Sequence, residues 1–501
     1  MSTVLRAARV DGAVVDLTVD RGVITAIRPH SPGPGVALDG RTVVPGLWDN
    51  HVHFDQWALA RRRLDLSAVG SAAEVVALVA ERLRTGSGTG SGTGSGTGSD
   101  GMLVGAGFRD GLWPDAPRLD LLDAVSPGVR VVLVSGDLHC CWLNSAAAAH
   151  YGIVPDPSGV VREQDWHPIM EDVRRADDLD RFADEAARAA AARGVVGIVD
   201  FEAPFPLDAW RSRITSGSRS LRVVSSVWPP SLDEALERGV RTGEAVPGTD
   251  GLLTMGPLKI VTDGSLNTRT AFCVDPYPGL EGTAHPCGMV LVPPSELVPL
   301  LERAAAGGLD VAVHAIGDAA NTFVLDAFAS TGARGRVEHA QLLQVSDVPR
   351  FAALGIVASV QPEHAVDDRD VADHYWAGRT GRAFVFRSLL DAGAALALGS
   401  DAPVAPLDPW VAIAAAVHRS GDGRAPWHPE QQVTPAEALA ASSGPDGPLR
   451  EGRVADLVVL DADPLSATPA RLREMPVAAT MLGGTWTHLS DSARDLGTVR
   501  S

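Results

Sequence analysis

Four histidines and one aspartate occur where they could bind metal ions together. His51 and His53 are two residues apart in Pro-Gly-Leu-Trp-Asp-Asn-His-Val-His, and residues at i and i+2 of a strand point to the same face. His314, His339 and Asp401 come at the ends of predicted strands, after Val-Ala-Val, Arg-Val-Glu and Leu-Ala-Leu-Gly-Ser. Imidazole and carboxylate groups are ligands for zinc and other divalent first-row metals. The pattern therefore predicts a metal site, provided that the fold brings these side chains together.

Each of these residues, taken singly, has a more ordinary interpretation. A lone histidine at a strand end is more often a hydrogen-bonded structural residue than a ligand. An aspartate after Gly-Ser, such as Asp401, commonly caps the next helix. The joint occurrence of all five at the ends of apolar runs favours the metal site.

Lys259 is the only lysine among the 43 basic residues. A bias toward arginine codons explains the scarcity of lysine, but not its survival inside the apolar run around 258–261. A buried lysine amine can lose its proton, whereas a guanidinium stays charged. An uncharged amine can add CO₂ to form a carbamate, and that anion can bridge two cations. The sequence therefore predicts that Lys259 is buried and functional.

The elements that must position these residues are short apolar runs separated by helical stretches. The predicted strands are Val43–Trp48, Val195–Val199, Leu221–Val227, Leu258–Val261, Val311–Val313, Arg336–Val337, Ile356–Val360 and Ala395–Leu398. The predicted helices include Glu171–Arg193, Ser295–Ala306, Asp318–Ala329 and Phe384–Gly393. Eight apolar strands alternating with helices are typical of an α/β fold, a closed (β/α)₈ barrel of the TIM type. All the candidate ligands would then meet at one mouth of the barrel.

Three regions follow from the change of pattern along the chain. Short β-like stretches at both ends predict a small β-sandwich domain, composed of residues 1–45 and 448–501. The barrel is predicted over 46–60 and 171–447. The interval 61–170 breaks the alternation and is predicted to be an insertion after the first strand. It includes strand-like pieces at Met102–Ala106 and Arg130–Val134 and a repetitive GSGT loop at 86–99.

Composition excludes several classes of function. The chain has 501 residues and a net charge of −19, which argues against binding nucleic acid or an anionic membrane surface. We expect no apolar segment long enough to span a membrane and no signal peptide. Two of the four cysteines are adjacent and no CxxC spacing occurs. A reduced, cytoplasmic protein is therefore expected. A homodimer is left open.

The order of several motifs resembles the amidohydrolase superfamily, and within it the amidohydrolase-3 (YtcJ-like) group that includes N-substituted formamide deformylase. The resembling segments are VVPGLWDNHVHF, GDLHCCWLNSAA, LKIVTDGSLNTRTAF, VAVHAIGDAANTFVLDAF, RVEHAQLL, SVQPEH, GSDAPV and REGRVADLVVLDADP. They cover nearly the whole chain in order. The resemblance implies a metal-dependent hydrolase with a (β/α)₈ barrel, a small β-sandwich made by both termini and an insertion after strand one.

The resemblance also implies a centre of two divalent metal ions, with zinc expected and manganese, iron and cobalt left open. One ion would be held by His51, His53 and Asp401, and the other by His314 and His339. A carboxylated Lys259 would bridge the two ions.

Four further residues are expected near the substrate by the same resemblance. His139 and Asn144 match a DxH…NS motif of the insertion, although a structural role is as good an interpretation for both. Arg269 could bind a substrate carboxylate or pair with an aspartate such as Asp263. His364, after Gln-Pro-Glu, is a weaker candidate. Asn-Thr replaces Gly-Ser just before Arg269, which puts the substrate preference in doubt.

The predicted reaction is hydrolysis of an amide-type C–N bond in a small molecule, such as an N-substituted formamide or an N-acyl amine. A hydroxide bridging the two metals would attack, and Asp401 would carry the proton to the leaving nitrogen. The alternatives are a deaminase or a cyclic-amide hydrolase on the same scaffold. A more remote alternative is a non-catalytic barrel that acts as an assembly module.

Overall fold

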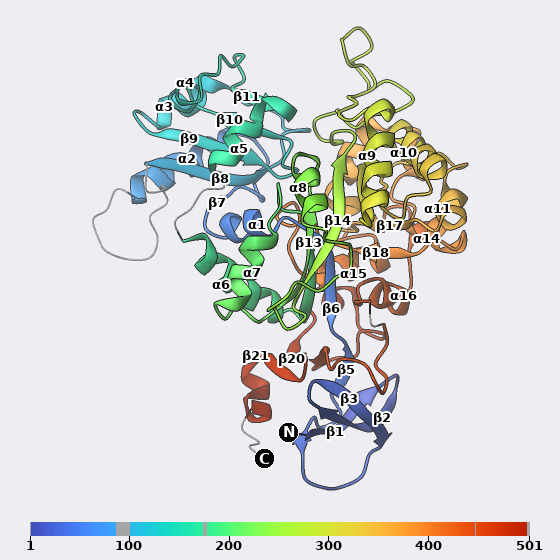
Figure 1. Cartoon of the computed structure of the whole chain (residues 1–501). Helices are drawn as coiled ribbons and strands as arrows, with labels where there is room; N and C mark the ends of the chain where they lie inside the picture. Colours follow the sequence, from blue (N-terminus) through green and yellow to red (C-terminus); the bar gives the residue numbers. More distant parts are fainter. Residues whose placement is uncertain (1, 87–100, 174–177, 446, 498–501) are drawn as a thin grey trace.

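The barrel is an eight-stranded parallel sheet in a computed structural model that describes residues 2–86, 101–173, 178–445 and 447–497. Its strands, in spatial order, are β18 (Leu396–Leu398), β17 (Val357–Val360), β16 (Gly335–His339), β15 (Val311–Ala315), β14 (Leu253–Val261), β13 (Arg222–Val227), β12 (Val195–Asp200) and β6 (Leu47–Val52). The strand count and the parallel order confirm the prediction. Figure 1 shows this barrel between the terminal sheet and the insertion.

The prediction of one continuous strand over Val43–Trp48 is wrong. The structure divides it at Gly46 into β5 (Thr42–Pro45), which belongs to the terminal sheet, and β6, which opens the barrel. A Cβ at Gly46 would lie 2.4 Å from a methyl group of Val196. The chain therefore needs glycine where it passes from one sheet to the other against β12.

The two edge strands of the barrel sheet meet near the mouth. The Asp401 amide donates to the His51 carbonyl oxygen at 2.7 Å, and the Asn50 side chain donates to the Leu398 carbonyl at 3.0 Å. Val52 and Ala402 also form an isolated parallel bridge. These contacts align the end of β6 with the segment that follows β18, although the two are about 350 residues apart in the chain. The predicted ligands His51, His53 and Asp401 lie at this junction.

Helices cover the outside of the barrel. They include α6 (Leu179–Ala191), α7 (Leu207–Thr215), α8 (Leu232–Glu237), α9 (Pro294–Gly307), α10 (Asp318–Thr331), α11 (Val348–Leu354), α14 (Phe386–Asp391), α15 (Pro409–His418) and α16 (Pro435–Ala441). The predicted helix over 171–193 is too long: α5 (His167–Val173) precedes α6, and residues 174–177 lie outside the described part. In α6 the alanines at 183, 186, 187 and 190 are all buried, because that spacing forms one helix face.

Strands from both termini form one sheet, as predicted. Its members are β1 (Ser2–Val10), β2 (Ala13–Asp20), β3 (Val23–Pro29), β4 (Val36–Ala37), β5, β19 (Leu457–Leu460), β20 (Val477–Leu482) and β21 (Thr485–Leu489). β5 joins the two ends of the chain, since it pairs parallel to β1 and antiparallel to β19. Both terminal segments contribute to one apolar core that includes Leu5, Leu17, Leu457 and Met481.

The insertion has its own five-stranded sheet. Its strands are β7 (Leu64–Asp65), β8 (Met102–Phe108), β9 (Arg130–Ser135), β10 (Cys140–Leu143) and β11 (Val160–Arg162), with α1 (Phe54–Ala60) leading in and α2 (Ala72–Gly86), α3 (Leu119–Val125) and α4 (Ser145–His150) packed nearby. The two predicted strands are β8 and β9. The predicted loop at 86–99 lies outside the described residues except for Gly86. The limits of the three domains stay a prediction.

Among the described helices, none has the length and apolar character needed to cross a bilayer.

The packing of Trp48 gives a test of the barrel. A Cβ on Gly197 of β12 would lie 2.3 Å from the Trp48 indole ring. We expect Gly197→Ala to lower the free energy of unfolding by about 1–3 kcal/mol, because the core must shift to admit one methyl group. Gly282→Ala is the control, since nothing lies within 4 Å of its Cβ position. Equal stability of the two variants in denaturant titrations would contradict this packing.

Candidate metal centre

The barrel mouth brings together the residues predicted as ligands. His51 lies in β6, His314 in β15 and His339 at the end of β16. Lys259 lies near the end of β14, His53 directly follows β6, and Asp401 comes three residues after the end of β18. Carboxyl ends of parallel strands meet at one face of a barrel, so side chains far apart in sequence converge there.

Asp401 is the centre of a first group. Its Oδ1 lies 3.4 Å from His51 Nε2 and 3.5 Å from His53 Nε2. The backbone of Asp401 has φ = 60°, a left-handed conformation that is uncommon for residues other than glycine. The three donor atoms are close enough together to hold one cation.

A second group shares Asp401 and adds His339 and His364. His364 begins α12 (His364–Asp367), four residues after the end of β17, and its Nε2 lies 4.0 Å from Asp401 Oδ2. The rings of His339 and His364 are stacked, with centroids 6.1 Å apart. The structure therefore places His364 among the possible metal ligands, whereas the sequence placed it only near the substrate.

His314 lies beside this second group rather than in it. Its ring centroid is 4.5 Å from that of His339. Its Nε2, however, is 3.3 Å from the Gly264 carbonyl oxygen and 3.3 Å from Asp263 Oδ1. His314 is thus close to the predicted position, but its nearest polar partners belong to the loop after β14.

His51 and His339 are held in the neutral form that binds metals. Burial lowers the pKa of His51 well below its ordinary value, and the nearby Lys259 adds to this effect. Burial likewise lowers the pKa of His339, with its histidine neighbours next in importance. Burial alone would raise the pKa of Asp401, but the surrounding histidines hold that pKa well below its ordinary range. A cation would meet neutral imidazoles at His51 and His339 and a carboxylate at Asp401.

Lys259 is buried, as predicted, with 2% of its surface exposed. Its Nζ lies 3.4 Å from His51 Nε2 and 4.6 Å from the centre of the Phe201 ring. Burial lowers the pKa of Lys259 to about 8, against the opposing pull of Glu338 and Asp401. The amine can therefore lose its proton near neutral pH, which is what carbamate formation requires.

Glu338 is a buried carboxylate that the sequence reasoning missed. Its Oε2 lies 2.6 Å from His51 Nδ1, and its Oε1 is paired with Arg336 Nε at 2.7 Å. A carboxylate on the second nitrogen of a ligating histidine fixes the tautomer and the ring orientation. Alternation along β16 would put Glu338 and His339 on opposite faces. His339, however, has φ = 73°, and this turn lets both side chains reach the centre.

His139 joins the insertion to the barrel. Its Nδ1 lies 2.9 Å from Glu163 Oε2, and Glu163 Oε1 accepts a hydrogen bond from the Thr270 hydroxyl at 2.7 Å. The ring of His139 is 5.9 Å from that of His314. Although burial opposes it, the Glu163 carboxylate raises the pKa of His139 to about 9. The insertion therefore places an imidazolium beside the barrel mouth.

Asn144 does not join the mouth. It caps α4, and its Oδ1 accepts from the backbone amides of Ala147 and Val131. Its Nδ2 donates to Ser126 and to the Val129 carbonyl. The structural interpretation that the sequence left open therefore accounts for its contacts.

Arg269 does not pair with Asp263. The Asp263 carboxylate instead accepts from the backbone amides of Ile316, Gly317 and Phe272. The Arg269 guanidinium lies over the Tyr375 ring, 5.3 Å from its centre, and has no carboxylate partner among the residues that the structure describes. Its expected role with a substrate carboxylate stays a prediction.

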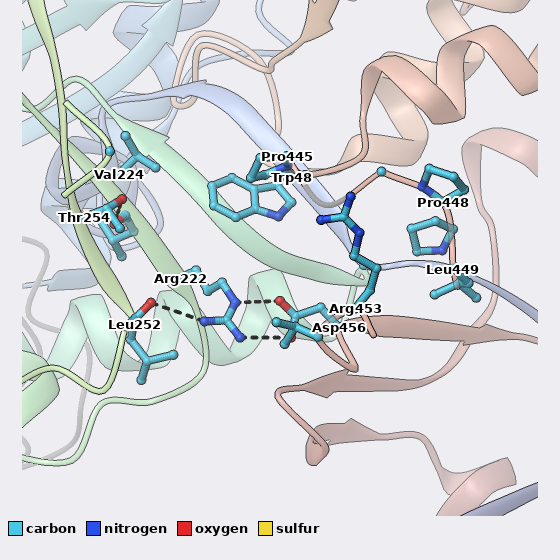
Figure 2. Close-up of a pocket in the computed structure, with 18 of the residues that line it drawn as sticks. Trp48, Arg222, Val224, Leu252, Thr254, Pro445, Pro448, Leu449, Arg453 and Asp456 are labelled. Carbon is cyan, nitrogen blue, oxygen red and sulfur yellow. Dashed lines mark hydrogen bonds and ion pairs between the residues drawn. The ribbon is translucent and has the colours of Figure 1, made fainter. Parts of the chain in front are cut away.

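A separate cavity of about 480 Å³ lies at the other end of the strands. Figure 2 shows Trp48 at this cavity and Arg222 paired with Asp456. Its walls come from the early residues of β6, β13 and β14 and from the segment around 444–456. Because the predicted ligands lie at the opposite ends of these strands, this cavity is not the candidate metal centre.

A parallel (β/α)₈ barrel with histidine–carboxylate groups at the carboxyl ends of its strands is the architecture of the metal-dependent barrel hydrolases. The chain belongs to the amidohydrolase family, whose sequence profile matches residues 35–488. The resemblance noted in the sequence is confirmed, and the family makes the chain a hydrolase.

Three relatives show how far the similarity extends. The putative amidohydrolase YtcJ of Bacillus subtilis (strain 168) is 28% identical over 493 residues, covering 90% of this chain and 89% of that protein. The N-substituted formamide deformylase of Arthrobacter pascens is 26% identical and covers 92% of both chains. A crystal structure of an uncharacterized metal-dependent hydrolase from Pyrococcus horikoshii OT3 has a TM-score of 0.76 at 24% identity, covering 94% of this chain and 99% of that one. It shares the fold.

The His139–Glu163 pair predicts a pH-dependent stability. We expect Glu163→Gln to lower the free energy of unfolding near pH 6 by about 3 kcal/mol, because a buried imidazolium loses its partner. Because the pKa of His139 is higher in the folded than in the unfolded chain, its protonation stabilises the fold. This stabilisation is fully present below the unfolded-state pKa of 6.5 and is lost as pH rises through the folded-state pKa of about 9. The difference in unfolding free energy between the wild type and Glu163→Gln should therefore shrink as pH rises from about 6.5 to about 9. Denaturant titrations at several pH values measure it.

Glu81→Gln is the control, since Glu81 is an exposed residue of α2. If the difference in unfolding free energy between the wild type and Glu163→Gln stays constant up to about pH 9, His139 is not held as an imidazolium.

Proposed function

We propose that this chain is a metal-dependent hydrolase that cleaves an amide-type C–N bond of a small molecule. The observation that carries the proposal is the group of His51, His53 and Asp401, whose donor atoms face one another at the barrel mouth. The intact set of ligands argues against a non-catalytic barrel, which would have no reason to keep buried imidazoles facing a carboxylate. The similarity to the formamide deformylase supports an amide as the substrate.

The residues of the centre fit a divalent cation. His339 Nδ1 and His364 Nε2 are buried without any hydrogen-bond partner among the described residues. Buried polar atoms without a partner are rare in folded proteins, because each costs free energy. Imidazole nitrogen together with one carboxylate is a donor set that suits zinc and its neighbours. Zinc stays the expected metal.

The chemistry of hydrolysis is divided between the cation and the chain. A divalent ion, when bound, lowers the pKa of water and polarises a carbonyl oxygen. Asp401 faces the same space with a carboxylate held in its charged form. It accepts the proton from the attacking water and then delivers that proton to the leaving nitrogen, so that the amide yields a carboxylic acid and an amine.

Two side chains of the insertion and the β14 loop are proposed to face the substrate. His139 lies close to His314 at the mouth, and its positive charge suits an oxygen of the substrate. Arg269 presents a guanidinium on the Tyr375 ring, and that arrangement suits a carboxylate.

Lys259 is proposed to carry a carbamate that bridges two cations, in line with the family resemblance. The buried amine and its pKa of about 8 support this role.

We also propose a reducing, cytoplasmic location, because Cys140, Cys141, Cys273 and Cys287 are all free thiols. The occurrence of a homodimer stays a prediction.

Two substitutions test the proposed function. We expect Asp401→Asn to lower kcat by roughly 10²–10⁴-fold, because the amide cannot take up and return the proton. Lys259→Arg keeps the charge but cannot form a carbamate, and should lower kcat by roughly 10–100-fold or more. Activity is measured on N-substituted formamides, N-acyl amines and N-acyl amino acids after loading with zinc or manganese. Asp120→Asn, at an exposed ion pair of the insertion, is the control. Near wild-type turnover in either active-site variant would refute the scheme.

The contact between Glu338 and His51 gives a test that does not depend on the substrate. Glu338→Gln removes the carboxylate from His51 Nδ1 and should weaken zinc binding by roughly 10–100-fold. Competition with a chromogenic chelator measures the affinity directly. An unchanged zinc affinity, with the fold intact by circular dichroism, would mean that Glu338 has no part in orienting His51.

A further inference from the structure

The cavity of about 480 Å³ at the amino-terminal ends of the barrel strands has the size and the lining of a small-molecule site. Ligand cavities in proteins measure about 300–1,000 Å³ and are lined mainly by apolar side chains with a few polar groups. The apolar side chains here include Val224, Leu252, Met255, Leu449 and Val454. Four of the lining residues are exposed, namely Gly243, Gly251, Pro445 and Pro448. A small molecule can therefore reach the cavity from solvent.

The walls of this cavity come from two parts of the fold. One wall is formed by the first residues of β6, β13 and β14, and another by the segment 444–456, which leads into β19 of the terminal sheet. Arg222 connects the two (Figure 2): its Nη2 lies 3.2 Å from Asp456 Oδ1, and its Nη1 donates to the Gly251 carbonyl oxygen at 3.3 Å. Asp456 Oδ1 also accepts from the Gly483 amide at 2.6 Å. Arg222 and Asp456 therefore satisfy each other and leave recognition of a ligand to the other polar groups.

Trp48 offers a hydrogen-bond donor to the cavity. Its ring lines the cavity and is 8% exposed, and no residue in the described part of the chain accepts from its indole N–H. A tryptophan N–H that is largely buried usually has a partner. Gly444 leaves the space beside this nitrogen open, since a Cβ at Gly444 would lie 2.2 Å from Trp48 Nε1. The acceptor that Trp48 lacks can therefore come from a ligand.

Arg453 brings positive charge to the same part of the cavity. Figure 2 shows its guanidinium on the side toward which the nitrogen of Trp48 is turned. A guanidinium has five N–H donors, so it can meet a ligand in addition to a partner within the protein. Among the described residues that line the cavity, two are arginines and one is an aspartate. An acid group on the ligand would complement this excess of positive charge, and carboxylates suit the planar guanidinium.

We infer that this cavity binds a small aromatic carboxylate, whose ring packs on the Trp48 indole and whose acid group meets the Trp48 N–H and Arg453. The site is separate from the candidate metal centre at the other end of the barrel and does not depend on the proposed hydrolysis. Because the walls belong to the barrel and to the segment that leads into the terminal sheet, the ligand holds these two parts of the fold together.

The test measures binding of 2-naphthoate to the whole chain by calorimetry and by thermal melts. Metal ions are first removed with a chelator, so that the carboxylate cannot bind to an ion at the barrel mouth. Trp48→Phe removes the indole N–H, and Thr254→Phe places a ring in the cavity that Thr254 lines. Thr85→Phe is the matched control, because Thr85 is an exposed residue of α2. Arg269→Gln tests whether the probe binds at the mouth instead. Circular dichroism checks that each variant folds.

We expect one 2-naphthoate per chain and a saturable rise in melting temperature, because a ligand that binds the folded chain stabilises it. Trp48→Phe should weaken the binding by roughly 10-fold or more, since a hydrogen bond to a charged group is lost. Thr254→Phe should abolish it. Thr85→Phe and Arg269→Gln should bind like the wild type. The uncharged 2-naphthalenemethanol should bind roughly 10-fold more weakly than the carboxylate or worse.

Three results would overturn the inference. The first is a wild type that shows no saturable binding of 2-naphthoate. The second is an unchanged affinity in Trp48→Phe or in a folded Thr254→Phe. The third is loss of binding in Arg269→Gln, which would place the probe at the mouth of the barrel. None of these results bears on the hydrolysis of amides, so the proposed function is tested separately.

Discussion

The candidate metal centre depends on the contacts between β6 and the segment around the end of β18, which are the two edges of the barrel sheet. The first and last strands of the barrel sheet are about 350 residues apart in the chain, and the Asp401 amide reaches the His51 carbonyl at 2.7 Å. With φ = 60°, Asp401 turns its carboxylate across the mouth instead of capping the next helix. Together with the hydrogen bond from the His53 amide to the Ala402 carbonyl oxygen at 2.8 Å, the contact between Asp401 and His51 fixes the position of the His-X-His pair relative to the carboxylate.

The interior of the barrel shows how so many ionisable groups are buried together. Glu338 pairs with Arg336, and both Arg336 and Lys259 lie against the Phe201 ring. The imidazoles of His51 and His339 are neutral because burial lowers their pKa values. A buried charge is tolerated when it is paired, and costs several kcal/mol when it is not. The charges on the side chains therefore balance approximately, and the neutral imidazoles leave lone pairs for a cation.

The insertion forms its own sheet, and some of its side chains also lie at the mouth of the barrel. Through Arg109 it holds the loops that carry His364 and Asp401, and through Glu163 it positions His139 beside His314. The barrel strands carry the candidate ligands, whereas His139 of the insertion and Arg269 of the β14 loop are the residues proposed to face a substrate. This division explains why the family and the fold could be predicted with more detail than the substrate.

Residue type and periodicity determined the barrel, the terminal sheet and the burial of Lys259, because apolar alternation and the His-X-His spacing are local properties of the chain. The tertiary structure alone decided that Glu338 contacts His51 and that His364 joins the Asp401 group. It also separated Arg269 from Asp263 and divided the first strand at Gly46. These outcomes depend on left-handed turns at His339 and Asp401 and on contacts between distant segments. The contacts of Glu338 and His364 leave no local pattern in the sequence, because they arise only when the strands meet.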